Sequence, residues 1–238
     1  MAAIEVRGLS RTYRQGQPGE VKALDDVTLG VQAGEFVSVV GRAGSGKTTL
    51  LHCLGLLVRP TAGQVLIDGV DTAALSDDER AELRGRRIGF VLQDGNLLPA
   101  LTVLENVLLP LRYAWFRRGA RSRARELLDL VGMADQADAR PDQLKPGQAQ
   151  RVAIARSLIK APVAVLADEP TGEVDDETSD ELLYLMQQVN RMNDVTFVVA
   201  THDPEVASVM DRMIRVNGGK VVADQRLRGD SVRLSGIR

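Results

Sequence analysis

The segment Gly41-Arg-Ala-Gly-Ser-Gly-Lys-Thr48 constrains the fold of this chain more than any other. Its spacing, a glycine followed after four residues by Gly-Lys-Thr, is that of a phosphate-binding loop. An apolar stretch at residues 35–40 precedes it and a helical stretch at about 47–57 follows, which a chance glycine-rich turn would not explain. Backbone N–H groups and the positive end of the helix would then surround phosphate oxygens. The residues expected to bind phosphate are Gly41, Arg42, Ala43, Gly44, Ser45, Gly46, Lys47, Thr48 and Thr49.

The rest of the chain alternates between short apolar stretches and helical stretches, a pattern typical of an α/β sheet with crossover helices. Further strands are predicted at residues 64–69, 88–93, 163–168 and 195–200. Ser76 and Glu79 have capping-box spacing and predict a helix through Leu83. The β signal disappears from about 97 to 160, where helical periodicity at 101–114, 121–131 and 148–159 predicts an inserted helical subdomain. One domain is expected over residues 1–228, with a flexible basic tail at 229–238.

Composition excludes several other classes of function. A formal net charge of −2 gives no long-range attraction to nucleic acid, and 3% aromatic residues leave little for base stacking. No stretch approaches the ~20 apolar residues of a membrane span, and the N-terminus does not resemble a secretory signal. The single cysteine, Cys53, lies in an apolar helical stretch and is interpreted as a buried small hydrophobe. Any membrane role is therefore expected to come through a partner.

Two carboxylates end the apolar strand predicted at residues 163–168. Asp168 is expected to hold Mg²⁺, together with the hydroxyl of Thr48, while Lys47 meets the β- and γ-phosphates. Glu169 is the candidate general base for an attacking water. The alternative is a solvated acidic turn after a strand. The presence of a phosphate-binding loop in the same chain favours a role for the two carboxylates in nucleotide hydrolysis.

Histidine occurs only twice in the chain. His202 follows the strand predicted at 195–200, where it is placed to sense the γ-phosphate; an ordinary turn histidine is the alternative. His52 lies among leucines on the helix after the phosphate-binding loop and is interpreted as a packing residue.

The order of these motifs along the chain resembles that of ATP-binding subunits of ABC transporters. Besides the residues above, the resemblance includes Gln93 after a strand, Gly147-Gln148 opening a helix, and Asp175 three residues after Gly172. It implies a RecA-like P-loop core with an N-terminal antiparallel β portion and a helical subdomain. It also implies ATP and Mg²⁺ as ligands, ATP hydrolysis, and a second ABC ATP-binding subunit that completes the site.

The resemblance also gives roles to individual residues. By it, Gln93 contacts Mg²⁺ and links the site to a membrane partner, and Tyr13 stacks on adenine. Asp175 belongs to a loop that communicates across a dimer. Lys145, Gly147 and Gln148 occupy the signature segment that meets the nucleotide held by the opposite subunit.

The segment at residues 97–110 resembles a narrower branch, that of lipoprotein release, macrolide export and cell division. The implied partner is an integral membrane, permease-like subunit with few spans and a large outer domain, which would place this chain at the inner, cytoplasmic face of the membrane. Residues 97–113 would form part of the groove that receives the partner. Core packing is the alternative for most of the leucines there. ABC proteins of DNA repair or the ribosome fit less well, because the chain has neither long insertions nor a fused second domain.

The signature segment departs from the family pattern. Leu144-Lys-Pro-Gly-Gln148 stands where the family has Leu-Ser-Gly-Gly-Gln, and Pro146 has no N–H to donate. Lys145 is still able to meet a phosphate as a point charge, and Pro146 suits the first turn of a helix. In a homodimer both sites would carry the change, whereas in a heterodimer one site would be intact. An ATP-gated clamp that scarcely hydrolyses ATP therefore remains the alternative to an ATPase motor.

Overall fold

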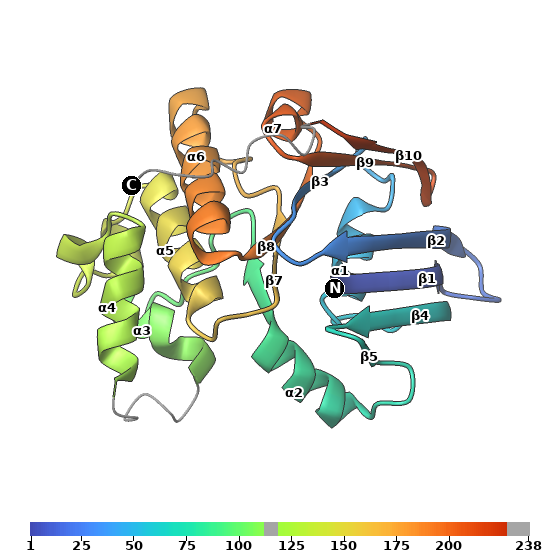
Figure 1. Cartoon of the computed structure of the whole chain (residues 1–238), viewed down its shortest axis with the longest axis horizontal. Helices are drawn as coiled ribbons and strands as arrows, with labels where there is room; N and C mark the ends of the chain where they lie inside the picture. The colour runs from blue at the N-terminus through green and yellow to red at the C-terminus, as the bar shows by residue number, and fades with distance from the viewer. Residues whose placement is uncertain (112–118, 228–238) are drawn as a thin grey trace.

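The computed structural model describes residues 1–111 and 119–227, which form two sheets with helices packed around them (Figure 1). The predicted tail at 229–238, the end of the helix predicted at 101–114, and the last two residues of the predicted partner groove, Arg112 and Tyr113, lie outside these ranges. No helix among the described residues has both the length and the apolar character needed to span a membrane.

A six-stranded, mainly parallel sheet forms the centre of the molecule, with strand order β10-β9-β3-β8-β7-β6. Its two innermost strands are buried on both faces, as their continuous apolar sequences require, and Phe36 packs edge-on against Phe197 with ring centroids 5.7 Å apart. Four predicted strands are confirmed here within two residues. The strands are β3 (Phe36–Val40), β6 (Ile88–Val91), β7 (Ala164–Asp168), β8 (Thr196–Thr201), β9 (Arg212–Asn217) and β10 (Lys220–Arg226).

A second, antiparallel sheet has the order β2-β1-β4-β5 and faces helix α1 (Lys47–Leu54) across an apolar layer. It confirms the N-terminal antiparallel portion, and β4 confirms the strand predicted at 64–69. Helix α1 ends three residues earlier than predicted, because Leu56 adopts a left-handed φ of +57°. The strands are β1 (Ala2–Tyr13), β2 (Val21–Gln32), β4 (Ala62–Ile67) and β5 (Val70–Asp71).

Helix α2 (Asp77–Arg87) begins at the capping box predicted from Ser76 and Glu79, and it runs four residues past the predicted end at Leu83. Its last turn contains three arginines, which suit the negative end of a helix. Its backbone leads directly into β6 and so places the loop that contains Gln93.

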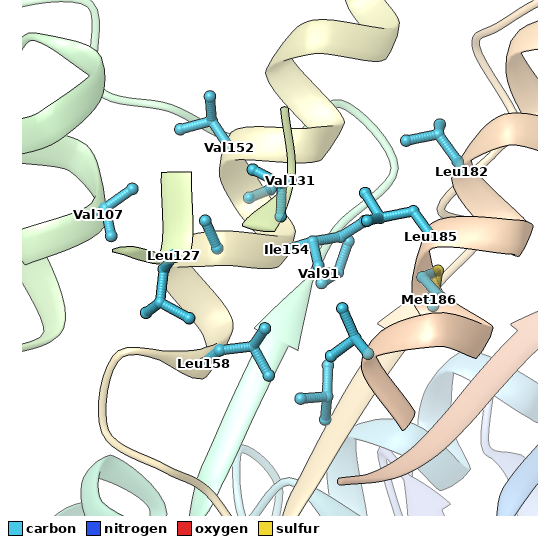
Figure 2. Close-up of a cluster of buried hydrophobic side chains, with 14 of the residues drawn as sticks. Val91, Val107, Leu127, Val131, Val152, Ile154, Leu158, Leu182, Leu185 and Met186 are labelled. Atoms are coloured by element: carbon cyan, nitrogen blue, oxygen red, sulfur yellow. The ribbon is translucent and has the colours of Figure 1, made fainter. Parts of the chain in front are cut away.

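The described residues between β6 and β7 contain helices and no strand. Their apolar faces, with those of α6, make one buried layer against the parallel sheet (Figure 2). Thr102 and Glu105 form a second capping box, which the sequence analysis missed. The helices are α3 (Val103–Leu108), α4 (Ala120–Leu130), η2 (Ala134–Gln136), η3 (Pro141–Gln143) and α5 (Pro146–Leu158), followed beyond β7 by α6 (Asp176–Asn193) and α7 (Pro204–Ser208). That residues 97–160 form a distinct subdomain stays a prediction.

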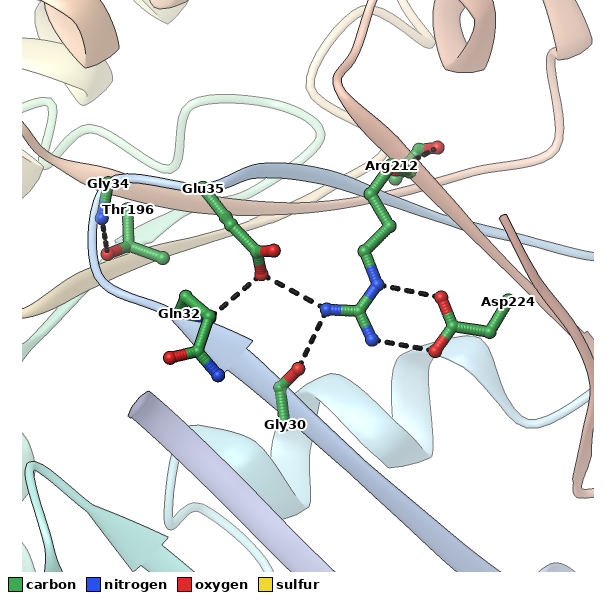
Figure 3. A network of polar contacts seen from close by, with 8 residues as sticks. Gly30, Gln32, Gly34, Glu35, Thr196, Arg212 and Asp224 are labelled. Carbon is green, nitrogen blue, oxygen red and sulfur yellow. Dashed lines mark hydrogen bonds and ion pairs between the residues drawn. The ribbon is translucent and has the colours of Figure 1, made fainter. Parts of the chain in front are cut away.

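Arg212 joins the two sheets (Figure 3). Its guanidinium donates to Gly30 O of β2 at 2.8 Å, pairs with Glu35 at 3.1 Å, and makes two bonds to Asp224 of β10 at 2.7 and 2.6 Å. The arginine side chain is 14% exposed, so these bonds lie largely away from water.

Candidate functional site

The loop between β3 and α1 has a backbone that only glycine accommodates at its key positions. Gly46 precedes α1 with a φ of +110°, and a Cβ atom there would approach Ala23 O to 2.5 Å. Gly41, at the other end of the loop, has no room for a Cβ between Val216 O and the Ser45 side chain. The hydroxyl of Ser45 is buried and has no hydrogen-bond partner within residues 1–111 and 119–227. The loop therefore holds an unused donor and the first N–H groups of a helix at one point, a suitable environment for a phosphate oxygen.

Lys47, the first residue of α1, turns its side chain back into this loop. It is 7% exposed, and its ammonium donates to Gly41 O at 2.7 Å and to Arg42 O at 3.4 Å. The ammonium also lies 3.8 Å from Glu169 Oε1. A cation is thus fixed between the loop and the end of β7.

Glu169 follows the last residue of β7 and has a left-handed φ of +46°, which is uncommon for a non-glycine residue. Its N–H donates to Ala200 O at 2.9 Å, which ties it to the end of β8. Its Oε2 accepts a bond from His202 N at 3.3 Å and lies 3.0 Å from His202 Nδ1. Lys47, Glu169 and His202 are therefore brought together, as the sequence predicted, at the carboxyl ends of parallel strands.

Asp168 has one carboxylate oxygen, Oδ1, that is buried and lacks a hydrogen-bond partner in the described part of the chain. Burial is the main reason that the pKa of Asp168 is raised, although a hydrogen bond with Thr48 opposes this effect. A buried carboxylate oxygen and a neighbouring hydroxyl are both oxygen ligands, which Mg²⁺ prefers. The residues present therefore fit a magnesium ion.

A cleft of about 990 Å³ opens beside the loop. Five predicted residues other than His202 line it, and the remaining wall comes from β3, β9, β10 and the start of α7. The residues of that wall were not predicted as part of the site. The apolar residues Ile214 and Val216, which alternate with polar ones and are buried in β9, were the available signal for a strand there. The lining residues are Val40, Gly41, Arg42, Ala43, Lys47, Glu169, His202, Pro204, Met213, Arg215, Val216, Asn217 and Val222.

Gln93 and Tyr13 do not line this cleft. Gln93 lies in the loop after β6, with its side-chain nitrogen 3.3 Å from the position a Cβ would take on Gly172. It is therefore near the segment that follows Glu169. Tyr13 ends β1, and the guanidinium of Arg11 lies 4.6 Å from the centre of its ring.

The signature segment begins α5. Pro146 is its first helical residue, as expected, and the N–H of Lys145 donates to Gln148 Oε1 at 2.9 Å. Asp175 caps α6 by accepting bonds from Thr178 N and Oγ1 at 2.9 and 3.0 Å, which hold its pKa below the ordinary value. These residues line a second hollow, of about 330 Å³, that has no lining residue in common with the first cleft. The hollow is lined by Lys145, Pro146, Gly147, Gln148, Arg151, Glu173, Val174, Asp175, Thr178 and Glu181.

A glycine-rich loop between a strand and a helix, with a buried lysine and two carboxylates at the end of another parallel strand of the same sheet, defines a P-loop nucleoside triphosphatase. Residues 24–172 match the ABC transporter family model. This chain belongs to that family.

Individual relatives agree with this assignment. The chain is 45% identical over 223 residues to the lipoprotein-releasing system ATP-binding protein LolD of Bordetella pertussis, covering 93% of this chain and 96% of LolD. It is 44% identical over 238 residues to the macrolide export ATP-binding/permease protein MacB of Syntrophobacter fumaroxidans, covering 99% of this chain but only 33% of MacB. The solved dimer of the ATP-binding cassette MJ0796 bound to ADP and Pi superposes with a TM-score of 0.85 at 41% identity, covering 95% of this chain and 99% of that one.

The chain is thus an ATP-binding cassette of the ABC transporter type, and it is an ATPase. The predicted RecA-like core with an antiparallel sheet and helical insertion is the fold of such cassettes.

Proposed function

We propose that this chain drives a membrane partner by hydrolysing ATP between its own P-loop cleft and the signature hollow of a second cassette. The observation that carries the proposal is the separation of the two hollows: the residues of one line none of the other. A single chain therefore does not bring its signature to its own Lys47. The solved MJ0796 cassette, at 41% identity, is a dimer. A second chain of the same kind is thus the simplest source of the missing wall.

Within one site the roles follow from the contacts of the P-loop. Lys47 stabilises negative charge on the β- and γ-phosphates, and Ser45 and the loop N–H groups add donors. The nucleotide-binding residues in the same chain are Tyr13, which stacks on adenine, and Gly41, Arg42, Ala43, Gly44, Ser45, Gly46, Lys47, Thr48 and Thr49. Lys145, Gly147, Gln148 and Asp175 act on the nucleotide held by the other chain.

Glu169 is the general base. Its carboxylate lies between the ammonium of Lys47 and the imidazole of His202, at 3.8 and 3.0 Å. Because Lys47 lies beside Oε1 and His202 contacts Oε2, the carboxylate of Glu169 is oriented before water binds. His202 is 69% exposed at its side chain, so it is free to leave Glu169 and approach the γ-phosphate.

Magnesium is the proposed cofactor, held by Thr48, Asp168 and Gln93. When bound it would neutralise charge on the β- and γ-phosphates. The buried, unpartnered Oδ1 of Asp168 supports this assignment, because a cation would supply the interaction that the oxygen lacks.

The proposed partner is a permease-like membrane subunit, and the proposed location is the inner face of the cell membrane, bound through that partner. The support is the similarity to LolD and MacB, whose names describe lipoprotein release and macrolide export. The substrate on which the whole assembly acts is set by the partner.

A second candidate function is an ATP-gated clamp with slow hydrolysis. It is favoured by the signature, where Pro146 has no N–H and the N–H of Lys145 is already bonded to Gln148. We expect Lys145→Ser with Pro146→Gly to raise the turnover of a homodimer, by at most about ten- to a hundredfold for one recovered charge-assisted hydrogen bond. Lys145→Ser alone should do less. Unchanged turnover of the double variant in a verified homodimer would remove the signature as the cause of slow hydrolysis.

The dimer itself is tested by the mass of Glu169→Gln in solution with Mg-ATP, measured by light scattering. We expect the mass of two chains with Mg-ATP and of one chain with Mg-ADP, because loss of the base traps the state before hydrolysis. Lys47→Ala combined with Glu169→Gln is the control and should stay a monomer. A monomer at saturating Mg-ATP for Glu169→Gln would contradict a site shared between two chains.

A further inference from the structure

The loop that contains Gln93 is held by two side chains of one helix, α5. Gln150 is 3% exposed, and its side-chain N–H₂ donates to Leu92 O at 2.9 Å and to Gln93 O. Two turns further along, Arg156 donates to Gly95 O at 2.6 Å and to Asn96 O at 2.7 Å. Within residues 92–96 of the loop, four of the five carbonyls thus accept bonds from α5.

The backbone of this loop also lies directly on α5. Gly95 has a φ of +66°, and a Cβ atom there would be 3.1 Å from Ala149 O. The N–H of Gly95 donates to Leu92 O at 3.0 Å, which closes the loop into a tight turn. The loop therefore has little freedom to move unless α5 moves with it.

The same loop sets the place of Gln93 relative to the base. The side chain of Gln93 lies beside Gly172, whose N–H donates to Glu169 O at 3.1 Å. A displacement of the loop would therefore separate Gln93 from the segment that carries Glu169. At its other end, α5 starts at Pro146, directly after Lys145.

We propose that Gln150 and Arg156 are positioning residues that clamp the Gln93 loop to α5, so that contact of a second cassette with the start of α5 adjusts Gln93 at the site of this chain. The proposal rests on the role of Gln93 proposed above. It links the second hollow of a chain to the Gln93 loop of the same chain through a single helix. Neither residue lines the P-loop cleft or the second hollow, so both would act only through the loop.

A purely structural role is the competing explanation, since buried carbonyls need donors in any case. Gln150 argues against it, because its Oε1 is buried and accepts no hydrogen bond from any residue in the described ranges. A buried acceptor without a partner is destabilising. The amide is therefore not the side chain that would best stabilise this position.

The test compares clamp variants with a matched control on the full-length chain. Gln150→Leu and Arg156→Met remove the donors while keeping side-chain size, and Arg156→Lys keeps one charged donor. Lys160→Met is the control: Lys160 follows α5 and donates to Gly85 O at 2.6 Å, a carbonyl outside the loop. Thermal unfolding of each variant reports any loss of stability.

Turnover kinetics separate positioning from packing. We expect Gln150→Leu and Arg156→Met to lower kcat about tenfold with KM for ATP within about twofold, and Arg156→Lys and Lys160→Met to stay near the unsubstituted chain. Gln93→Ala should lower kcat as well, and adding it to Gln150→Leu should cost little more, because both changes remove the same function. If the double variant instead loses kcat by the product of the two single losses, the two residues act independently and the clamp is overturned.

The outcome for Gln93→Ala distinguishes the two proposals. If Gln93→Ala alone leaves kcat unchanged, the proposed role of Gln93 is wrong. If it lowers kcat while the clamp variants do not, only the clamp is wrong.

Hydrogen exchange tests the clamp without reference to turnover. We expect faster exchange in peptides covering residues 92–96 for Gln150→Leu and Arg156→Met, and no change there for Lys160→Met. Unchanged exchange in both clamp variants would overturn the proposal.

Discussion

Asp168 ends β7 with one buried carboxylate oxygen that has no hydrogen-bond partner among the residues that the structure describes. Burial raises its pKa above the ordinary value of 3.8. The folded chain therefore binds this proton more tightly than the unfolded chain does. The stability that the residue contributes is fully present below its unfolded pKa and is lost as the pH rises through the folded pKa.

Asp168→Asn should therefore raise the melting temperature at neutral pH in EDTA, because the asparagine has no charge to bury. The gain should shrink at about pH 4, where protonation already relieves the unsubstituted chain. Magnesium-dependent ATP turnover should be lost in the same variant. Circular dichroism melts at the two pH values make the measurement, and a lower melting temperature at neutral pH would contradict the proposed conflict between stability and metal binding.

Some residues of the candidate site could be predicted from the sequence and others could not. Lys47, Glu169 and His202 were predictable because motif spacing and strand ends bring them to one sheet edge. There the carboxylate of Glu169 lies 3.8 Å from the ammonium of Lys47 and 3.0 Å from the imidazole of His202. Arg215 and Met213 were not, since nothing in their local sequence indicates that β9 lies beside β3. Pairing between strands 175 residues apart is a tertiary property, as the partners Val37 and Arg212 illustrate.

A local signal made several elements predictable, although not every such signal was recognised. The capping box at Ser76 starts α2 where expected, because both hydrogen bonds are formed by residues three apart. The sequence analysis did not place the hairpin of β9 and β10, although Asn217-Gly218-Gly219-Lys220 is a turn signal. The long strands β1 and β2 were also not delimited, since register shifts such as that between Val6 and Leu9 interrupt their alternation.

The junction of the two sheets depends on Arg212. Arg212→Leu should lower the free energy of unfolding by about 2–3 kcal/mol, less than for a fully buried pair because Asp224 is 38% exposed. Glu35 and Gly30 O would lose a donor while remaining largely covered. Urea unfolding makes the measurement. Arg7→Leu, which breaks an exposed pair with Glu5, is the control and should leave the midpoint unchanged; equal midpoints for both variants would contradict a structural role for the junction.

The predicted partner groove is the second element open to test. Leu104 and Leu108 of α3 are buried in the core, so packing explains them, whereas Leu98 is 43% exposed. Leu98→Glu should leave ATP affinity unchanged and reduce co-purification with the permease-like subunit at least about tenfold, since a charge would enter an apolar contact. Met192→Glu, on α6, is the control. Equal recovery of the partner with both variants would place the docking surface elsewhere.

At the scale of the whole molecule, the separation of the two hollows is the basis of the proposed dependence on a second chain. The P-loop cleft is lined by Lys47, His202 and the proposed base Glu169, while the signature and Asp175 line the other hollow. Helix α5 connects the second hollow to the Gln93 loop. Association of two chains would therefore complete both ATP sites and act on both Gln93 loops at the same time.

The most direct test of this account is the ATP turnover of Glu169→Gln beside that of the unsubstituted chain, with ATP affinity measured in parallel. We expect phosphate release to fall about a hundredfold or more, the range for loss of a general base, while ATP affinity stays unchanged. Lys47→Ala should instead lose affinity, because it removes the cation that meets the phosphates. Undiminished phosphate release by Glu169→Gln would contradict the assignment of Glu169 as the base and, with it, the site described above.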